Sequence, residues 1–248
     1  MPVVTNLKPA AREENRVNVF LDNLFAFSLD IAQVVEFHLK IGKTLTEKEV
    51  KDLEHASEFG KLYGRTLEWA LARPRSIKET HDHLTQKLTR LKYDNKLREK
   101  NRERLKADPA LKARQRDLKI KTTIRREYTN DDIEKVIARL IEKGYISDER
   151  FAKWYIENRN FKKGVSRRRL ADELTKKGVA RDLIAELLES SDRNDSSEIK
   201  KFIKKKGPKS TPEKLLRSLV SHGFPYDLSR TLVEEYFSAP DFFDSSVD

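Results

Sequence analysis

The chain has 248 residues, of which 37% are hydrophobic and 38% are charged, with no cysteine and a formal net charge of +11. This length supports one large or two modest domains, and the high charged fraction favours slender helical layers over one thick globule. The lack of cysteine excludes disulfide frameworks and thiolate metal sites. No window approaches the roughly 18 apolar residues of a membrane span, and the N-terminal residues lack a signal-peptide core. We therefore expect a cytoplasmic protein without a membrane partner.

The positive charge is concentrated in one part of the chain. Residues 1–56 have a net charge of −2 and the last eleven residues have −3, so residues 57–237 must hold +16. Such a basic segment favours a polyanionic partner, either a nucleic acid or a protein assembled on one. The alternative is a surface that is basic only for solubility.

Residues 1–56 are predicted to form a small strand-containing cap. Three runs of β-branched and aromatic residues come first, at 3–7, 17–21 and 24–27. Asp22-Asn23 can join the last two runs as a hairpin, and helical spacing begins at Ile31. Thr46 and Glu49 then have the spacing of a capping box at the start of a helix.

Residues 57–146 are predicted to be a first three-helix repeat. An apolar stripe at helical spacing runs from Phe59 to Leu71. Pro74 ends it, because proline disfavours helix at the preceding residue. A second stripe, from Ile133 to Ile141, ends at Gly144 in the position where helices commonly turn left-handed.

An insertion at 93–128 interrupts this first repeat. Its residues include thirteen Lys/Arg and six Asp/Glu. Asp108-Pro109 is a good helix start, so the pattern predicts a long, charged helical hairpin whose return helix carries Leu111, Leu118 and Ile120. Because the apolar seam is thin, a disordered basic loop is the alternative.

Residues 147–191 and 195–237 are predicted to be the second and third three-helix repeats. The residues Leu170, Leu174, Gly178, Leu183 and Leu187 recur 45 positions later as Leu215, Leu219, Gly223, Leu228 and Leu232. A further amphipathic helix precedes each set, at 148–160 and 196–206. An acidic tail, 238–248, follows and is read either as a frayed end or as a docking motif.

No catalytic constellation is visible: there is no Gly-rich phosphate loop, HExxH motif or nucleophile elbow. We therefore expect a binding protein that is not an enzyme and uses no cofactor or metal. Basic residues instead gather beside helix starts, where they oppose the helix dipole, which suggests that an external anion such as phosphate or a carboxylate-rich surface offsets the cost. The alternative is that these residues are simply solvated. The candidate partner-binding residues are Arg73, Arg75, Arg159, Lys162, Lys163, Arg167, Arg168, Arg169, Lys176 and Lys177.

Two stretches resemble the RecX family of recombination regulators: RTLEWALARPRSIKET (65–80) and GYISDERFAKWYIENRNFKKGVSRRRLADELTKKGV (144–179). The resemblance is strong over 60–90 and 129–190 and weaker over the third repeat. It implies three tandem three-helix repeats, and a non-catalytic protein that lies in the groove of the RecA–single-stranded-DNA filament and restrains the recombinase. The insertion at 93–128 departs from the usual family pattern.

We expect a monomer that binds the RecA filament, with non-specific contacts to single-stranded DNA inside it. The different class of function that stays open is a DNA-binding protein of helix-turn-helix type that acts without RecA. It would prefer particular duplex sequences, whereas the filament binder would bind DNA alone only weakly.

Overall fold

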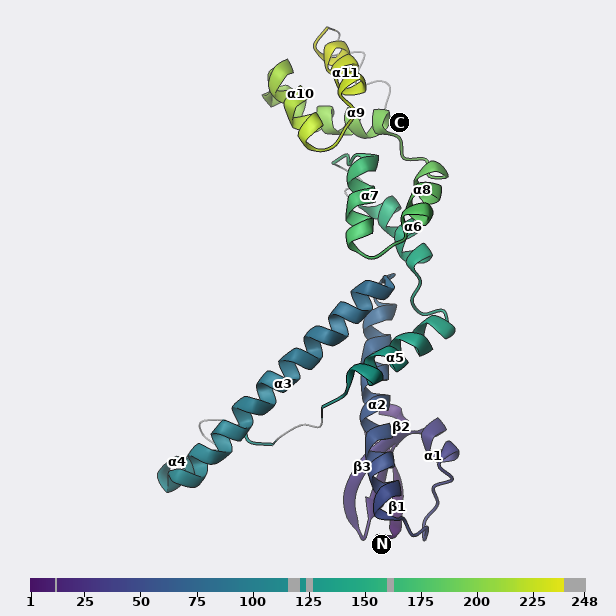
Figure 1. The fold of residues 1–248 in the computed structure, drawn as a ribbon, viewed down its shortest axis with the longest axis vertical. Helices are drawn as coiled ribbons and strands as arrows, with labels where there is room; N and C mark the ends of the chain where they lie inside the picture. The colour runs from purple at the N-terminus through teal and green to yellow at the C-terminus, as the bar shows by residue number, and fades with distance from the viewer. Residues whose placement is uncertain (12, 116–120, 124–126, 160–162, 239–248) are drawn as a thin grey trace. The chain divides into compact units, whose positions relative to one another are not determined.

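The computed structural model describes residues 1–11, 13–115, 121–123, 127–159 and 163–238 (Figure 1). A three-stranded sheet at the N-terminus is followed by helices, so the predicted mainly α fold with a strand-containing cap is confirmed. The chain divides into two compact units. The first contains Met1–Ala72 and His81–Lys143, and the second contains Arg73–Thr80 and the chain from Gly144 onwards.

The N-terminal sheet is antiparallel, in the order β1 (Val4–Ala10), β2 (Glu13–Leu21), β3 (Leu24–Asp30). Asp22 and Asn23 form the predicted turn with φ of 48° and 66°, as both central residues of a type I′ hairpin require. The cap is therefore a three-stranded sheet that contains the expected hairpin. A short helix, α1 (Ile31–Glu36), follows directly.

Helix α2 (Glu47–Leu71) covers the sheet and continues into the first repeat. The capping box of Thr46 and Glu49 is confirmed. The helix runs without a break through Ala56, so the predicted boundary between cap and repeat falls inside a continuous helix. The Gln33 amide donates to the Ala56 carbonyl at 2.7 Å, and the buried Arg16 guanidinium reaches the carbonyls of Ser28 and Ser57. These bonds tie the sheet, α1 and α2 together.

The first repeat consists of α2, α3 (Ile77–Ala107) and α5 (Asn130–Glu142). Helix α5 packs on α2, where His55 Nε2 lies 3.0 Å from Asp132 and the Arg139 guanidinium lies over the Tyr63 ring. Gly144 follows α5 with φ of 68°, which confirms it as the left-handed stop.

Among the described residues, the insertion forms the outgoing helix of the predicted hairpin and the start of its return helix. Its outgoing arm is the end of α3, and Asp108 caps the short α4 (Pro109–Ala113) as expected. The return is not helical at 121–123 or 127–129, while Leu118 and Ile120 lie outside the described residues. Polar side chains of α3 instead bind the return: Asn95 donates to Glu127, and Arg98 to the Thr123 carbonyl, both at 2.9 Å. With so few apolar residues, hydrogen bonds to extended chain replace a helix–helix seam.

The second and third repeats lie in the second unit, and each has three short helices around its own apolar core (Figure 1). They are α6 (Asp148–Asn158), α7 (Arg167–Lys176) and α8 (Arg181–Glu189), then α9 (Asp195–Lys206), α10 (Pro212–Ser221) and α11 (Tyr226–Ser238). Gly178 and Gly223 separate the second and third helices with φ of 87° and 85°. The predicted 45-residue repeat is thus a structural repeat, because its leucines at 170, 174, 215 and 219 are all fully buried.

A repeated hydrogen-bonded joint connects each repeat to the next. Ser166, the N-cap of α7, donates to the carbonyl of His222 at 2.7 Å, and His222 is the C-cap of α10. Ser76 donates in the same way to the carbonyl of Lys177, the C-cap of α7, at 2.8 Å. Both serine hydroxyls also accept a backbone N–H of their own helix start, from Arg169 and Glu79.

An aspartate completes each joint. The Arg167 N–H donates to Asp195 at the start of α9, at 2.9 Å, and the Ile77 N–H donates to Asp148 at the start of α6, at 2.8 Å. The matching position in the third repeat is Pro212, which has no backbone N–H to donate. The third repeat therefore cannot form the same joint with a further repeat.

Replacing Ser166 by alanine is expected to cost about 1–3 kcal/mol of unfolding free energy, because it removes both an N-cap and a buried inter-repeat bond. Thr211 is the matched control, since it caps α10 at the equivalent position but is exposed. Thr211→Ala should cost no more than about 1 kcal/mol. Urea unfolding followed by circular dichroism measures both losses, and equal losses would contradict the role of the joint.

Candidate binding surface

The three arginines that open α7 already have an anion beside the helix start. The carboxylate of Asp195 accepts the Arg167 N–H, and the Ser166 hydroxyl accepts that of Arg169. An acidic group at a helix N-terminus interacts favourably with the helix dipole. The sequence pointed to an external anion at this helix start, whereas the structure places a carboxylate of the same chain there, so the first turn of α7 does not need a bound phosphate.

A cluster around Glu173 uses two of the candidate cations. Arg159 binds its carboxylate with two hydrogen bonds, of 2.7 and 3.0 Å, and Arg169 adds a third at 3.2 Å. The Tyr155 hydroxyl donates at 2.6 Å. The bonds from Arg159, with those from Tyr155 and Arg169, lower the pKa of Glu173 to about 2. Burial and Glu173 together raise the pKa of Tyr155 to about 12.

A second cluster forms around Glu79. Arg73 binds it with two hydrogen bonds, of 3.0 and 3.1 Å, and Lys177 Nζ lies 2.8 Å away. The Arg73 guanidinium also lies 5.1 Å from the centre of the Trp154 ring. Burial raises the pKa of Glu79, but Arg73 and Lys177 outweigh that effect and hold it below its usual value. Arg73 and Lys177 therefore stabilise the joint between the first and second repeats.

The ten candidate residues thus fall into distinct groups. Four of them are held by Glu79 or Glu173: Arg73, Arg159, Arg169 and Lys177. Burial, with the neighbouring Arg73, lowers the pKa of Arg75, and Lys162 lies outside the described residues. Lys163, Arg167, Arg168 and Lys176 remain on the surface of the second repeat.

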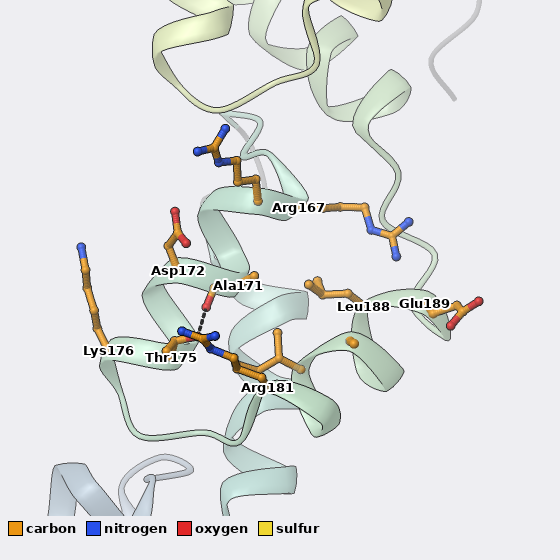
Figure 2. A pocket seen from close by; sticks show the side chains of 11 residues that line it. Arg167, Ala171, Asp172, Thr175, Lys176, Arg181, Leu188 and Glu189 are labelled. Atoms are coloured by element: carbon orange, nitrogen blue, oxygen red, sulfur yellow. Dashed lines mark hydrogen bonds between the residues drawn. The ribbon is translucent and has the colours of Figure 1, made fainter.

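Three of these surface cations edge a groove between α7 and α8 (Figure 2). The groove encloses about 880 Å³, and its floor is formed by the small and aliphatic side chains of Ala171, Ile184, Ala185 and Leu188. Arg167 lies near one end and Arg181 near the other, with Leu188 between them. Asp172 on α7 and Glu189 on α8 add one carboxylate on each side of the groove. An apolar floor with a mixed but mainly basic edge suits a polyanionic or mixed protein–nucleic-acid partner.

The candidate residues chosen from the sequence leave out three cations that the fold brings to this region. Arg181 opens α8 and lines the groove, while Lys205 and Lys206 at the end of α9 lie near Lys163 in a second pocket. The lysine run 204–206 is visible in the sequence. Its proximity to Lys163 depends on how the second and third repeats pack, which residue spacing alone does not show.

Within the described ranges, no group of three His, Asp or Glu side chains is arranged to hold a metal ion. Of the two neighbouring histidines on α3, His81 is exposed beside Glu134, whereas the His83 ring stacks on Trp69 at 4.0 Å. No helix in the described part of the chain is long and apolar enough to cross a membrane.

Two family models match the chain. Residues 2–46 match the N-terminal domain of the regulatory protein RecX, and residues 147–188 match the second three-helix domain of RecX. A regulatory protein RecX from Bacillus subtilis is 28% identical over 95% of this chain and 77% of its own length. The chain therefore contains two domains that match the RecX family. The family is described as regulatory.

Other relatives extend the similarity along the chain. A regulatory protein RecX from Listeria monocytogenes is 23% identical over 98% of this chain and 79% of its own length. A crystal structure of a regulatory protein RecX superposes with a TM-score of 0.62 at 16% identity, and the match covers 95% of this chain and all of that one. At this identity the structural match supports the fold alone, and the fold is the expected one.

Replacing Glu173 by glutamine is expected to cost about 1–3 kcal/mol at pH 7, because Arg159 and Arg169 lose their charged acceptor. The folded-state pKa of Glu173, about 2, lies below the ordinary 4.5. The carboxylate's contribution is therefore fully present above pH about 4.5 and is lost as the pH falls towards 2. Urea titrations at several pH values should show the wild type and Glu173→Gln converging over that range. Glu157→Gln, at an exposed position on α6, is the control and should change little.

Proposed function

We propose that this chain regulates the RecA recombinase by binding in the helical groove of the RecA–single-stranded-DNA filament and restraining its recombinase and ATPase activities. Similarity to the RecX family supports a regulatory role directed at RecA. The segment that carries a net charge of +16 is the repeat region, which suits a partner assembled on a nucleic acid. Tandem repeats also present an extended surface, as a helical filament requires of its ligands.

The observation that carries this proposal is the set of uncommitted cations around α7. Among the side chains that the structure describes, Arg167, Arg168, Lys176 and Arg181 take part in no ion pair. Arg168 and Lys176 lie two turns apart along α7, with Asp172 between them. Because the Glu79 and Glu173 clusters fix the ends of α7, these cations project from a rigid support.

The same geometry weakens the helix-turn-helix alternative. Recognition helices contact base edges in the major groove with their N-terminal residues. In this chain the start of the arginine-rich helix α7 is hydrogen-bonded to the third repeat, through Ser166–His222 and Arg167–Asp195. The third repeat would therefore hinder the N-terminal end of α7 from entering a groove of duplex DNA, while the Arg168 side chain stays exposed.

The direct test adds the chain to RecA filaments formed on single-stranded DNA and follows ATP hydrolysis and filament length. The wild type should lower both at stoichiometric concentration. The double variant Arg168→Glu/Lys176→Glu should need about tenfold more protein for the same effect, since it reverses two charges at the binding surface. No effect of the wild type would refute the proposed function.

The matched control for that variant is Lys48→Glu/Lys51→Glu, which makes the same charge change at exposed positions of α2 outside the groove. Its inhibition should stay within about twofold of the wild type if surface charge away from the groove only steers the encounter. Equal weakening by both variants would mean that net charge, and not the α7 surface, determines binding.

The charged arm is proposed to contact filament DNA or a neighbouring RecA protomer. Arg98 and Thr123 are already joined by a hydrogen bond of 2.9 Å, so residues 99–122 can be replaced by a short Gly-Ser linker. The deletion removes nine Lys/Arg and four Asp/Glu. Filament binding should weaken and its dependence on salt should decrease. If the deletion leaves filament binding unchanged at every salt concentration, the arm is not part of the interface.

A further inference from the structure

A second pocket lies where the loop before α7 meets the end of α9 and the end of α10. Its volume is about 310 Å³. The basic and aromatic side chains that line it are Lys163, Arg169, Lys205, Lys206, His222 and Phe202. Gly164 makes this approach possible: its φ is 73°, and a Cβ there would overlap the Glu198 carbonyl. Two repeats thus bring lysines together that lie about forty residues apart in the sequence.

The residues that line this pocket in the described part of the chain include no carboxylate. The nearest acids are already engaged. Glu198 is almost fully buried, accepts the Val165 N–H at 2.9 Å and pairs with Lys201 at 2.8 Å. Glu173 is bound by Arg159 and Arg169. The lysine charges of the pocket are therefore not neutralised by the acids around it.

The aromatic wall holds one of these lysines in place. Lys206 Nζ lies 4.6 Å from the centre of the Phe202 ring, and the His222 ring meets the same phenylalanine edge-on at 5.0 Å. His222 Nδ1 lies 2.7 Å from the Ser218 carbonyl, which fixes the imidazole against that wall. Lys163 and Lys205 are exposed and make no ion pair with the residues that the structure describes.

We propose that this pocket binds a backbone phosphate of a nucleic-acid strand. The choice of phosphate over a protein carboxylate follows from the charge of the surrounding segment, since the net charge of +16 over residues 57–237 suits a nucleic acid. Ammonium groups bind phosphate as point charges. Arg169 is already occupied by Glu173, so lysines supply the available charge. The inference rests on the proposed function only in expecting a nucleic acid at this surface.

The pocket is tested without RecA, by fluorescence anisotropy of a labelled oligothymidylate of about 20 nucleotides at several salt concentrations. The variant Lys163→Gln/Lys205→Gln should bind about tenfold more weakly at low salt. Its log–log salt slope should be shallower by roughly 1.4, since each phosphate contact on a single strand contributes about 0.7. The control Lys48→Gln/Lys51→Gln removes the same charge from α2 and should leave both quantities nearly unchanged.

The outcomes separate this pocket from the proposed function. An unchanged affinity and salt slope for Lys163→Gln/Lys205→Gln would overturn the phosphate site, whatever the chain does to RecA. If this variant still binds DNA like the wild type but no longer inhibits RecA, the phosphate site is also overturned. The pocket would then bind an acidic protein surface. A wild type that binds the oligonucleotide through the pocket but leaves RecA filaments unaffected would support the site and refute the proposed function. Thermal melting of the variant should match the wild type, because neither lysine has a described partner.

Discussion

The repeated joint of an N-cap serine with the next repeat's C-cap carbonyl is the interaction on which the array depends. A serine hydroxyl can accept one hydrogen bond and donate another. Ser76 and Ser166 use both capacities: they accept from their own helix and donate to the next repeat. The paired aspartates add a charge-assisted bond at each joint. Within the second unit, the short helices of the second and third repeats are thereby tied to one another.

This joint also decides which charges are available for binding. Several of the basic residues form ion pairs with Glu79 or Glu173, and these ion pairs stabilise the packing of the helices. Arg168 and Lys176 lie on the same helix as members of these clusters, yet both are exposed and take part in no ion pair among the described residues. Basic composition alone therefore overstates the binding surface, because part of the positive charge belongs to the scaffold.

Much of the fold could be predicted from local sequence. Leucine spacing and Gly178 and Gly223 identified two repeats, since buried positions and left-handed turns leave regular marks in the sequence. The capping box at Thr46 was equally local. The joints were not predictable in this way, because Ser76 and Lys177 are 101 residues apart. The return of the insertion was predicted to be helical throughout, but it is not helical at 121–123 and 127–129, where its described contacts with α3 are hydrogen bonds that leave no hydrophobic pattern in the sequence.

The central claim, that the α7–α8 groove faces the RecA filament, can be measured by site-specific cross-linking. The chain has no cysteine, so Thr175→Cys in the groove can carry a single photoreactive label. Thr231→Cys on α11 is the control, because both threonines are exposed and donate to the carbonyl four residues earlier. We predict efficient cross-links from position 175 to RecA only when RecA is assembled on single-stranded DNA, and weak ones from position 231. Equal labelling from both positions, or labelling of unassembled RecA, would contradict the account.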